Sequence, residues 1–436
     1  MLMDTLATLA AKTIYLEPGT TTVLRGVRLI DGTGAPPRQR VNIVIEGTRI
    51  ARIDNEGAAV PSSSAVRVID GSGLTVIPGL IDLHIHFTGD TALSAIERYS
   101  PNVWEPHRGI VSVWDAARAL EAGFTTVRNL GHGTAEQSYA LRRAVAEGLI
   151  PGPRILSAGW AISQTGGHGD PHFLPQELTL RYRPRSAFAD GPVECRRMVR
   201  QNFGEGADLI KIYTTEGSLV GERDVNRTVT NFTLDEIKAI TDEAHSRGAR
   251  VAAHATAAAG VRNAVLGGVD TIEHGGPLGD TPDLIDLMIE RGTFLVPTLK
   301  IYEVLATQGE RLGVKPYGVA IARDLLTRVK GYLRDAKDRG LKIACGTDTA
   351  LFDRGDNGRE LGLLVEAGFT PLEAITAATK VSAEAMGLDQ HIGTLEPGKV
   401  GELVALSADP LADIDVLRRD DKQAIKWIFK SREQLV

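Results

Sequence analysis

The chain has 436 residues, of which 43% are hydrophobic and 24% are charged, as in a globular protein with a large core. Its net charge of −6 is mild and no block of Lys or Arg stands out, which argues against nucleic acid or an anionic membrane as a partner. Two cysteines, Cys195 and Cys345, are too few for a disulfide framework. The N-terminus lacks the pattern of a signal peptide, and no apolar run reaches the roughly 18–20 residues of a membrane span. We therefore expect a cytoplasmic protein with one large and one smaller domain.

Both ends of the chain are rich in β-type segments. Residues 21–70 alternate short β-branched runs with turn residues, a pattern that predicts an antiparallel sheet. Similar runs occur near the C-terminus, at 402–407 and 425–436. The two β-rich ends predict one small β-sandwich domain formed by residues 1–75 and 390–436, with residues 76–389 as a separate domain.

The middle of the chain alternates strand-like runs with helix-compatible stretches, for example 111–123, 234–248 and 258–268. Eight strand-like runs are present, at 80–87, 125–130, 154–162, 209–214, 250–256, 271–275, 294–299 and 342–348. Eight repeats of this kind predict an α/β fold of the (β/α)8 TIM-barrel type. A doubly wound open sheet stays the alternative, because counting strands does not prove that they close into a barrel.

Residues with metal-binding chemistry stand at the ends of these runs, which form the catalytic face of a barrel. His84 and His86 are two apart on a strand, so both imidazoles face the same side and can clamp a divalent metal. Lys211 stands inside an apolar run, where burial favours the neutral amine. A neutral amine can add carbon dioxide to give a carbamate that bridges two metals. The alternative for Lys211 is a side chain that extends out of the barrel mouth.

Three more potential ligands, His254, His274 and Asp348, end the fifth, sixth and eighth runs. The Asp348 carboxylate could bind a metal and also take a proton from water. Each of these residues alone is compatible with an ordinary polar strand end, but ligand types at the ends of five strands together indicate a metal centre. His168 lies in a glycine-rich loop after the third run, either as a hydrogen-bond donor to substrate or as an ordinary loop histidine.

The ordered set of His84, His86, Lys211, His254, His274 and Asp348 resembles the binuclear, carboxylated-lysine subtype of the amidohydrolase superfamily. The resemblance extends over almost the whole chain and is carried by motifs at 76–86, 165–170, 206–212, 268–275, 346–348 and 393–411. The pattern is most similar to the imidazolonepropionase-like, Xaa-Pro dipeptidase branch, which includes ochratoxin-hydrolysing amidohydrolases. Two departures lie near the expected substrate site: Arg354-Gly355 replaces a frequent His-Gly pair, and Thr256 replaces a larger polar ring.

The resemblance implies two divalent metals, with Zn²⁺ the best match to the ligands. One metal would be held by His84, His86 and Asp348 and the other by His254 and His274, with carboxylated Lys211 and a hydroxide bridging the pair. The hydroxide would attack an amide carbonyl in an N-acyl amino acid, a dipeptide or a similar substrate with a free carboxylate, ochratoxin A among them. Asp348 would carry the proton to the leaving amine, and His168 would stabilise the oxyanion.

Four further residues follow strand ends and could receive the carboxylate or an aryl group of the substrate: Tyr213, Lys300, Tyr302 and Arg354. Each could instead be a loop or packing residue. A lactonase or cyclic-imide hydrolase would use the same metals, and a non-catalytic amidohydrolase-like scaffold is the alternative of another class. A mononuclear deaminase is disfavoured because Ala257 occupies the position of its usual acid. Homo-oligomers are common in this branch, and we expect one here, with an octamer as the suggested form.

Overall fold

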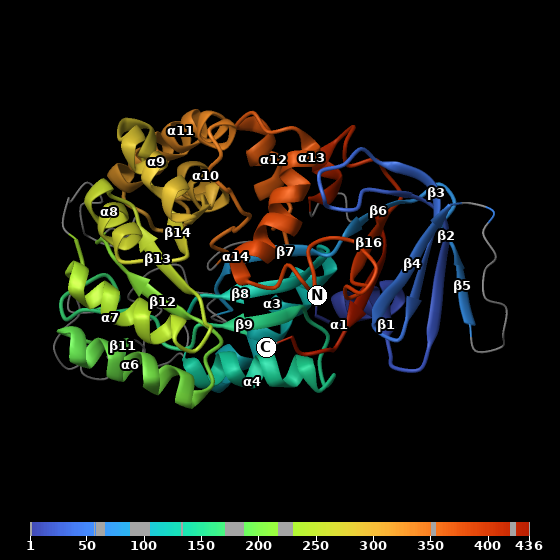
Figure 1. Ribbon diagram of the computed structural model, residues 1–436, viewed down its shortest axis with the longest axis horizontal. Coiled ribbons are helices and arrows are strands. Elements are labelled where there is room, and N and C mark those ends of the chain that lie inside the picture. The colour runs from blue at the N-terminus through green and yellow to red at the C-terminus, as the bar shows by residue number, and fades with distance from the viewer. Residues whose placement is uncertain are drawn as a thin grey trace.

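A computed structural model describes residues 2–55, 57, 66–87, 105–131, 134–170, 187–216, 230–349, 355–418 and 424–435 (Figure 1). Strands and helices alternate through most of these ranges, which is the arrangement of an α/β fold, as predicted. None of the helices within the described ranges has both the length and the hydrophobicity that a bilayer crossing requires. Arg354, one of the candidate substrate-binding residues, lies outside the described residues.

The two ends of the chain meet in one hydrogen-bonded sheet, at the right of Figure 1. Its order is β1-β17-β16-β6-β2-β3-β4, with β5 paired to β2. Strands β2, β3 and β4 are antiparallel as predicted, whereas β5 and β6 run parallel to β2. The strands are β1 (Thr13–Leu16), β2 (Thr21–Leu29), β3 (Arg38–Glu46), β4 (Arg49–Asn55), β5 (Val66–Asp70), β6 (Thr75–Pro78), β16 (Leu403–Leu406) and β17 (Ile425–Ser431).

The middle of the chain supplies parallel strands, which overlap all the predicted strand-like runs except the last. The third predicted run, 154–162, is not one strand but contains β9 and the start of β10, which lie in different sheets. A three-stranded sheet has the order β7-β8-β9 and a six-stranded sheet the order β11-β10-β12-β13-β14-β15. The strands are β7 (Leu80–Ile85), β8 (Phe124–Asn129), β9 (Arg154–Ser157), β10 (Ile162–Ser163), β11 (Ala187–Phe188), β12 (Ile210–Tyr213), β13 (Val251–Ala255), β14 (Thr271–His274) and β15 (Phe294–Val296).

The eighth predicted run, 342–348, lies between β15 and β7 without forming a regular strand. On one side, the backbone N–H of Ala344 donates to the Leu295 carbonyl over 2.9 Å; on the other, that of Leu83 donates to the Cys345 carbonyl over 2.9 Å. The segment makes isolated bridges, Ile343 to Leu295 and Thr349 to Ile85, in place of a continuous ladder, and Asp348 between them has a φ of 53°, which lies outside the β region. The segment therefore links the two parallel sheets, and its pairing continues past Asp348, where the backbone N–H of His86 donates to the Thr349 carbonyl over 3.1 Å.

Helices follow the parallel strands and lie outside them in Figure 1. The three predicted stretches are found as α3, α7 and α8, whereas α1 was not predicted. Helix α7 begins with a capping box in which Thr233 and Glu236 satisfy each other's backbone N–H groups. The helices are α1 (Leu2–Lys12), α3 (Glu105–Glu121), α4 (Ala135–Ala146), α6 (Pro192–Glu205), α7 (Leu234–His245), α8 (Ala258–Leu266), α9 (Pro282–Arg291), α10 (Leu299–Gln308), α11 (Pro316–Asp338), α12 (Arg359–Glu366), α13 (Pro371–Thr376) and α14 (Ser382–Met386).

A buried ion cluster joins the terminal sheet to the parallel strands. The Glu402 carboxylate accepts hydrogen bonds from Arg154 of β9 over 2.9 and 3.1 Å and from Lys430 of β17 over 2.5 Å. All three side chains are buried. A buried carboxylate paired on two sides is costly to break, because either cation would be left without its counter-charge.

Candidate metal centre and active site

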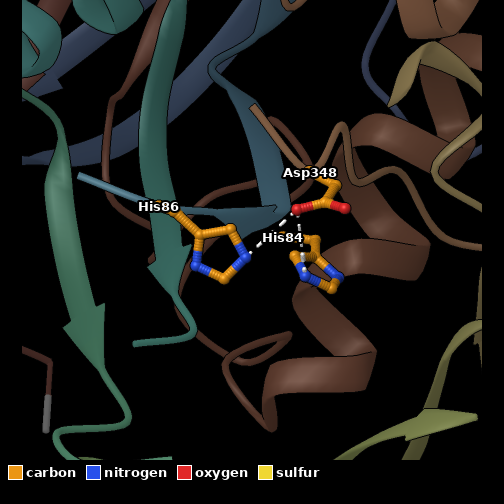
Figure 2. A group of neighbouring side chains, drawn as sticks. All are labelled: His84, His86 and Asp348. Carbon is orange, nitrogen blue, oxygen red and sulfur yellow. Dashed lines mark ion pairs between the residues drawn. The ribbon is translucent and has the colours of Figure 1, made fainter. Parts of the chain in front are cut away.

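Strand β7 and the segment after residue 342 bring three potential ligands together (Figure 2). Nε2 of His86 lies 3.1 Å and Nε2 of His84 lies 3.6 Å from Oδ1 of Asp348. The close passage of the two segments requires a glycine, because a Cβ at Gly346 would lie 2.9 Å from the Cβ of His84. The His-x-His spacing and the aspartate thus meet in one cluster, as the sequence predicts.

The remaining predicted histidines continue this cluster from neighbouring strands. The ring centroids of His84 and His274 are 4.9 Å apart, and those of His274 and His254 are 4.7 Å apart. Lys211 is buried on β12 and lies close enough to His84, His254 and His274 to influence all three electrostatically. The six predicted ligand side chains therefore converge on one region from separate segments of the chain.

Unusual backbone conformations place two of these ligands. His274 has a φ of 71° and Asp348 a φ of 53°, values rarely adopted by non-glycine residues. On a regular strand, Glu273 and His274 would point to opposite faces. The positive φ of His274 breaks this alternation, so that both the Glu273 carboxylate and the His274 ring reach the cluster.

Three imidazoles have their Nδ1 atoms tied to oxygen acceptors. Nδ1 of His84 lies 2.8 Å from Oε2 of Glu273, that of His86 lies 3.0 Å from the Gly131 carbonyl, and that of His274 lies 2.7 Å from the Thr298 hydroxyl. Donation from Nδ1–H to these oxygens leaves the Nε2 lone pairs for a metal.

Burial sets the protonation states of the cluster. It holds the pKa of His84 and of His254 well below the ordinary value and lowers the pKa of His274 to about 4. Burial also lowers the pKa of Lys211 to about 8, against the opposing effect of Glu273 and Asp348. Burial raises the pKa of Asp348, but the neighbouring imidazoles outweigh this effect and hold it below the ordinary value.

These states match the needs of a divalent cation. A metal ligand must be a neutral imidazole or an ionised carboxylate. The His84 imidazole, with its low pKa and with Nδ1 tied to Glu273, presents a lone pair at Nε2 toward an ionised Asp348. Nε2 of His254 is also buried and has no hydrogen-bond partner in the described part of the chain. Converging electron-pair donors without a proton between them are stabilised by a cation, so the residues fit a metal centre.

Three of the candidate catalytic and substrate-binding residues border the cluster. The His168 ring stacks on Tyr213 with centroids 4.6 Å apart and lies 4.3 Å from the His254 ring. The Tyr302 ring on α10 lies 6.5 Å from that of His274. His168, Tyr213 and Tyr302 are therefore all brought next to the predicted ligands.

Lys300 lies away from these rings. It is two residues before Tyr302 on α10, and two residues on a helix point in nearly opposite directions. Its Nζ is buried, has no hydrogen-bond partner among the described residues, and is influenced by Asp356, Asp82 and Glu360 rather than by the histidines. The structure thus brings Lys300 to a group of carboxylates outside the cluster.

Comparison with known proteins agrees with this geometry. The sequence profile of the amidohydrolase family matches residues 75–428. The chain belongs to this family. The ochratoxinase of Aspergillus niger is 32% identical in an alignment 439 residues long. The alignment covers 94% of this chain and 85% of the relative. Its solved structure has a TM-score of 0.82 with 29% identity and 95% coverage of both chains. A Xaa-Pro dipeptidase solved with methionine in its active site has a TM-score of 0.80 with 34% identity, covering 91% of this chain and 96% of that one.

The amidohydrolase is therefore a hydrolase that acts on amide bonds, and its family is typically metal-dependent. Three buried charged residues that support its cluster were missed in the sequence: Asp82, Arg128 and Glu273. All three stand inside apolar strand runs, where a charged side chain is rare unless it is paired. The sequence does contain a signal for them, because two acids and one arginine stand within runs that are predicted to be buried strands.

Proposed function

We propose that this amidohydrolase hydrolyses the amide bond of an N-acyl amino acid, a dipeptide or a similar carboxylate-bearing substrate, with ochratoxin A as one candidate. The observation that carries the proposal is the convergence of four histidines, Lys211 and Asp348 in protonation states suited to metals. The ochratoxinase and dipeptidase relatives support the class of substrate.

In this proposal two divalent metals, Zn²⁺ by ligand preference, occupy the cluster. His84, His86 and Asp348 would hold one metal, and His254 and His274 the other. Lys211, as its carbamate with carbon dioxide, would bridge the pair, and its lowered pKa supports a reactive neutral amine. When bound, such metals polarise the scissile carbonyl and lower the pKa of water towards neutrality.

The side chains of the protein then move protons and orient the substrate. Asp348 is ionised and half-enclosed by imidazoles, so its carboxylate is placed to accept a proton from the attacking water and return it to the leaving amine. His168 stands beside His254 and would donate to the carbonyl oxygen as it gains charge. Proton transfer of this kind contributes a factor of about 10²–10⁴ to the rate.

Among the residues named from the sequence, substrate contacts are proposed for Tyr213, Tyr302 and Arg354, whereas Lys300 lies among carboxylates outside the cluster. The positions of Tyr213 and Tyr302 support such a role, because both rings adjoin the predicted ligands. The hydroxyl of Tyr302 is buried and has no partner among the described residues, so an acceptor group of the substrate would satisfy it.

The fold that accompanies this function is a (β/α)8 barrel with a small β-sandwich domain. Closure of the barrel is supported by the hydrogen bonds of segment 342–349 to both β15 and β7. On the other side, the backbone N–H of Asp208, just before β12, donates to the Ser157 carbonyl of β9 over 2.8 Å.

The decisive experiment screens metal-reconstituted protein against N-acyl-L-amino acids, Xaa-Pro dipeptides, lactones and cyclic imides, with Asp348→Asn as the control. We expect hydrolysis of an amide substrate by the native protein and loss of this activity in the variant. Turnover of lactones or cyclic imides alone would assign the centre to those substrates. A purified protein without bound divalent metal and without hydrolysis of any compound would refute the proposal and favour a scaffold.

A further inference from the structure

A buried carboxylate stands behind one metal-binding histidine. Oε2 of Glu273 lies 2.8 Å from Nδ1 of His84, and both side chains are almost completely enclosed, with side-chain exposures of 0% and 2%. Because water cannot replace this contact, the imidazole N–H has Glu273 as its acceptor. Nε2 of the same ring is then the atom that faces Asp348.

A second buried pair holds the carboxylate in place. Arg128 of β8 donates from Nη2 to Oε1 of Glu273 over 2.6 Å and from Nε to the Leu83 carbonyl of β7 over 2.6 Å. The Thr271 hydroxyl also donates to Oε1, over 2.5 Å. The guanidinium therefore compensates the buried charge of Glu273 and ties β14 to β7, the strand that carries His84.

The acceptors of the other histidines differ in charge. The Nδ1 atoms of His86 and His274 meet a backbone carbonyl and a hydroxyl, both of which are neutral. Of these three imidazoles, His84 is the one that donates to an ionised group. A carboxylate acceptor fixes the tautomer more strongly and makes the opposite nitrogen a better electron-pair donor to a metal.

We infer that Glu273 is a positioning residue that sets the tautomer and donor strength of His84, and that Arg128 holds Glu273 in this role. The inference rests on the proposed metal-dependent function. It assigns a role to Glu273 and Arg128, neither of which is among the predicted metal ligands. It also identifies the His84–His86–Asp348 site as the one whose metal affinity depends on Glu273.

The test is Zn²⁺ binding by the purified protein, measured by competition with a chromophoric chelator, for the native chain and for Glu273→Gln. The amide cannot replace the carboxylate, because His84 and Arg128 both need an acceptor and the amide offers one acceptor and one donor. We expect Zn²⁺ affinity at one of the two sites to fall about 10–100-fold, the usual effect of removing such a partner, with the other site changed less than about threefold.

The chain offers a matched control in Glu402, another buried carboxylate paired with an arginine but belonging to the cluster beneath the terminal sheet. Glu402→Gln removes a comparable ion pair, so it tests whether loss of stability alone weakens metal binding. We expect its Zn²⁺ affinity at both sites to stay within about threefold of the native protein. An equal loss of affinity in both variants would overturn the assignment.

A double variant locates the effect. In a His84→Ala background, adding Glu273→Gln should change Zn²⁺ affinity by less than about threefold, because the partner through which Glu273 acts is gone. A full additional loss, or native affinity in the single Glu273→Gln variant, would overturn the inference while leaving the proposed function intact. If Glu273→Gln fails to fold, Glu273→Asp takes its place under the same criteria. The aspartate keeps the negative charge, but its side chain is too short to contact Nδ1 of His84. A native protein that binds no Zn²⁺ would refute the proposed function as well.

Discussion

Replacing Asp82 by Asn should destabilise the protein and displace Asp348. Asp82 is fully buried in β7 and accepts four hydrogen bonds. One oxygen, Oδ1, accepts from the backbone N–H groups of His84 and Thr347, each over 3.1 Å. The other, Oδ2, accepts from the Thr347 hydroxyl and from Asn357, each over 2.7 Å. The carboxylate thus anchors the residue directly before Asp348.

An amide in this position leaves at least one donor facing another donor. Suppose that the amide nitrogen takes the place of Oδ2. The Thr347 hydroxyl can then rotate and accept a hydrogen bond from it. The side-chain amide of Asn357 can accept only if it flips, and it would then lose the hydrogen bond that its Oδ1 accepts from the Gly355 N–H over 3.3 Å. One unsatisfied donor costs about 1–3 kcal/mol, and the two backbone bonds lose roughly 1 kcal/mol each when the acceptor is neutral. Burial raises the pKa of Asp82, because a charge is costly away from water. The neutral amide of Asn removes this cost, which offsets part of the loss. We expect a net loss of about 2–4 kcal/mol.

The assay is urea unfolding of metal-free protein, with Asp283→Asn as the control. Asp283 is an exposed carboxylate in the first turn of α9 that pairs with Arg262, so its replacement should leave the free energy of unfolding close to the native value. Turnover of Asp82→Asn should fall as well, because the turn that carries Asp348 loses its anchor. An unfolding free energy within about 0.5 kcal/mol of the native value would show that the four contacts do not hold this turn.

Three other outcomes are expected. Lys211→Ala and Asp348→Asn should each abolish turnover while circular dichroism shows a native fold; near-native activity in either variant would remove the role assigned to it. Strong chelation should inactivate the enzyme and Zn²⁺ should restore it, whereas full activity in the presence of excess chelator would exclude metal dependence. Glu402→Ala should lower the free energy of unfolding by about 3–5 kcal/mol, because Arg154 and Lys430 are left buried without a counter-charge. A loss below about 1 kcal/mol would show that solvent reaches this cluster.

The ligand set could be predicted from the sequence because it follows simple periodicities. His84 and His86 are two apart at the end of β7. Lys211, His254 and His274 lie on the parallel strands β12, β13 and β14, and Asp348 lies in the segment paired with β7, so the fold brings them together. The metal roles, the domain boundaries and the expected homo-oligomer stay predictions. The β-type runs at both chain ends predicted one β-sandwich domain, and the structure brings both ends into one hydrogen-bonded sheet. The parallel pairing of β5 and β6 with β2 did not follow from alternation alone.

Other features depend on backbone geometry that a sequence pattern does not reveal. Alternation along β14 predicts that Glu273 and His274 face opposite sides, and only the φ of 71° at His274 brings both inside. The same limit applies to the eighth predicted strand, which makes isolated bridges at Ile343 and Thr349 with the positive φ of Asp348 between them. Both features arise at residues of the candidate metal centre, where the backbone departs from regular strand geometry.

Two of the residues with positive φ, Thr298 and Asp348, adjoin backbone held by buried acidic side chains. Among the described residues, five that are not glycine have positive φ, and three of these are His274, Thr298 and Asp348. Such conformations cost on the order of 1–3 kcal/mol each and persist only where the surroundings hold them. Buried carboxylates do so here: Asp82 anchors the turn before Asp348, and Glu360 accepts the first N–H groups of α10, directly after Thr298. Asp82 and Glu360, the buried acidic side chains behind the cluster, therefore fix a backbone conformation that the local sequence would not adopt alone, as Glu273 fixes the orientation of the His84 ring.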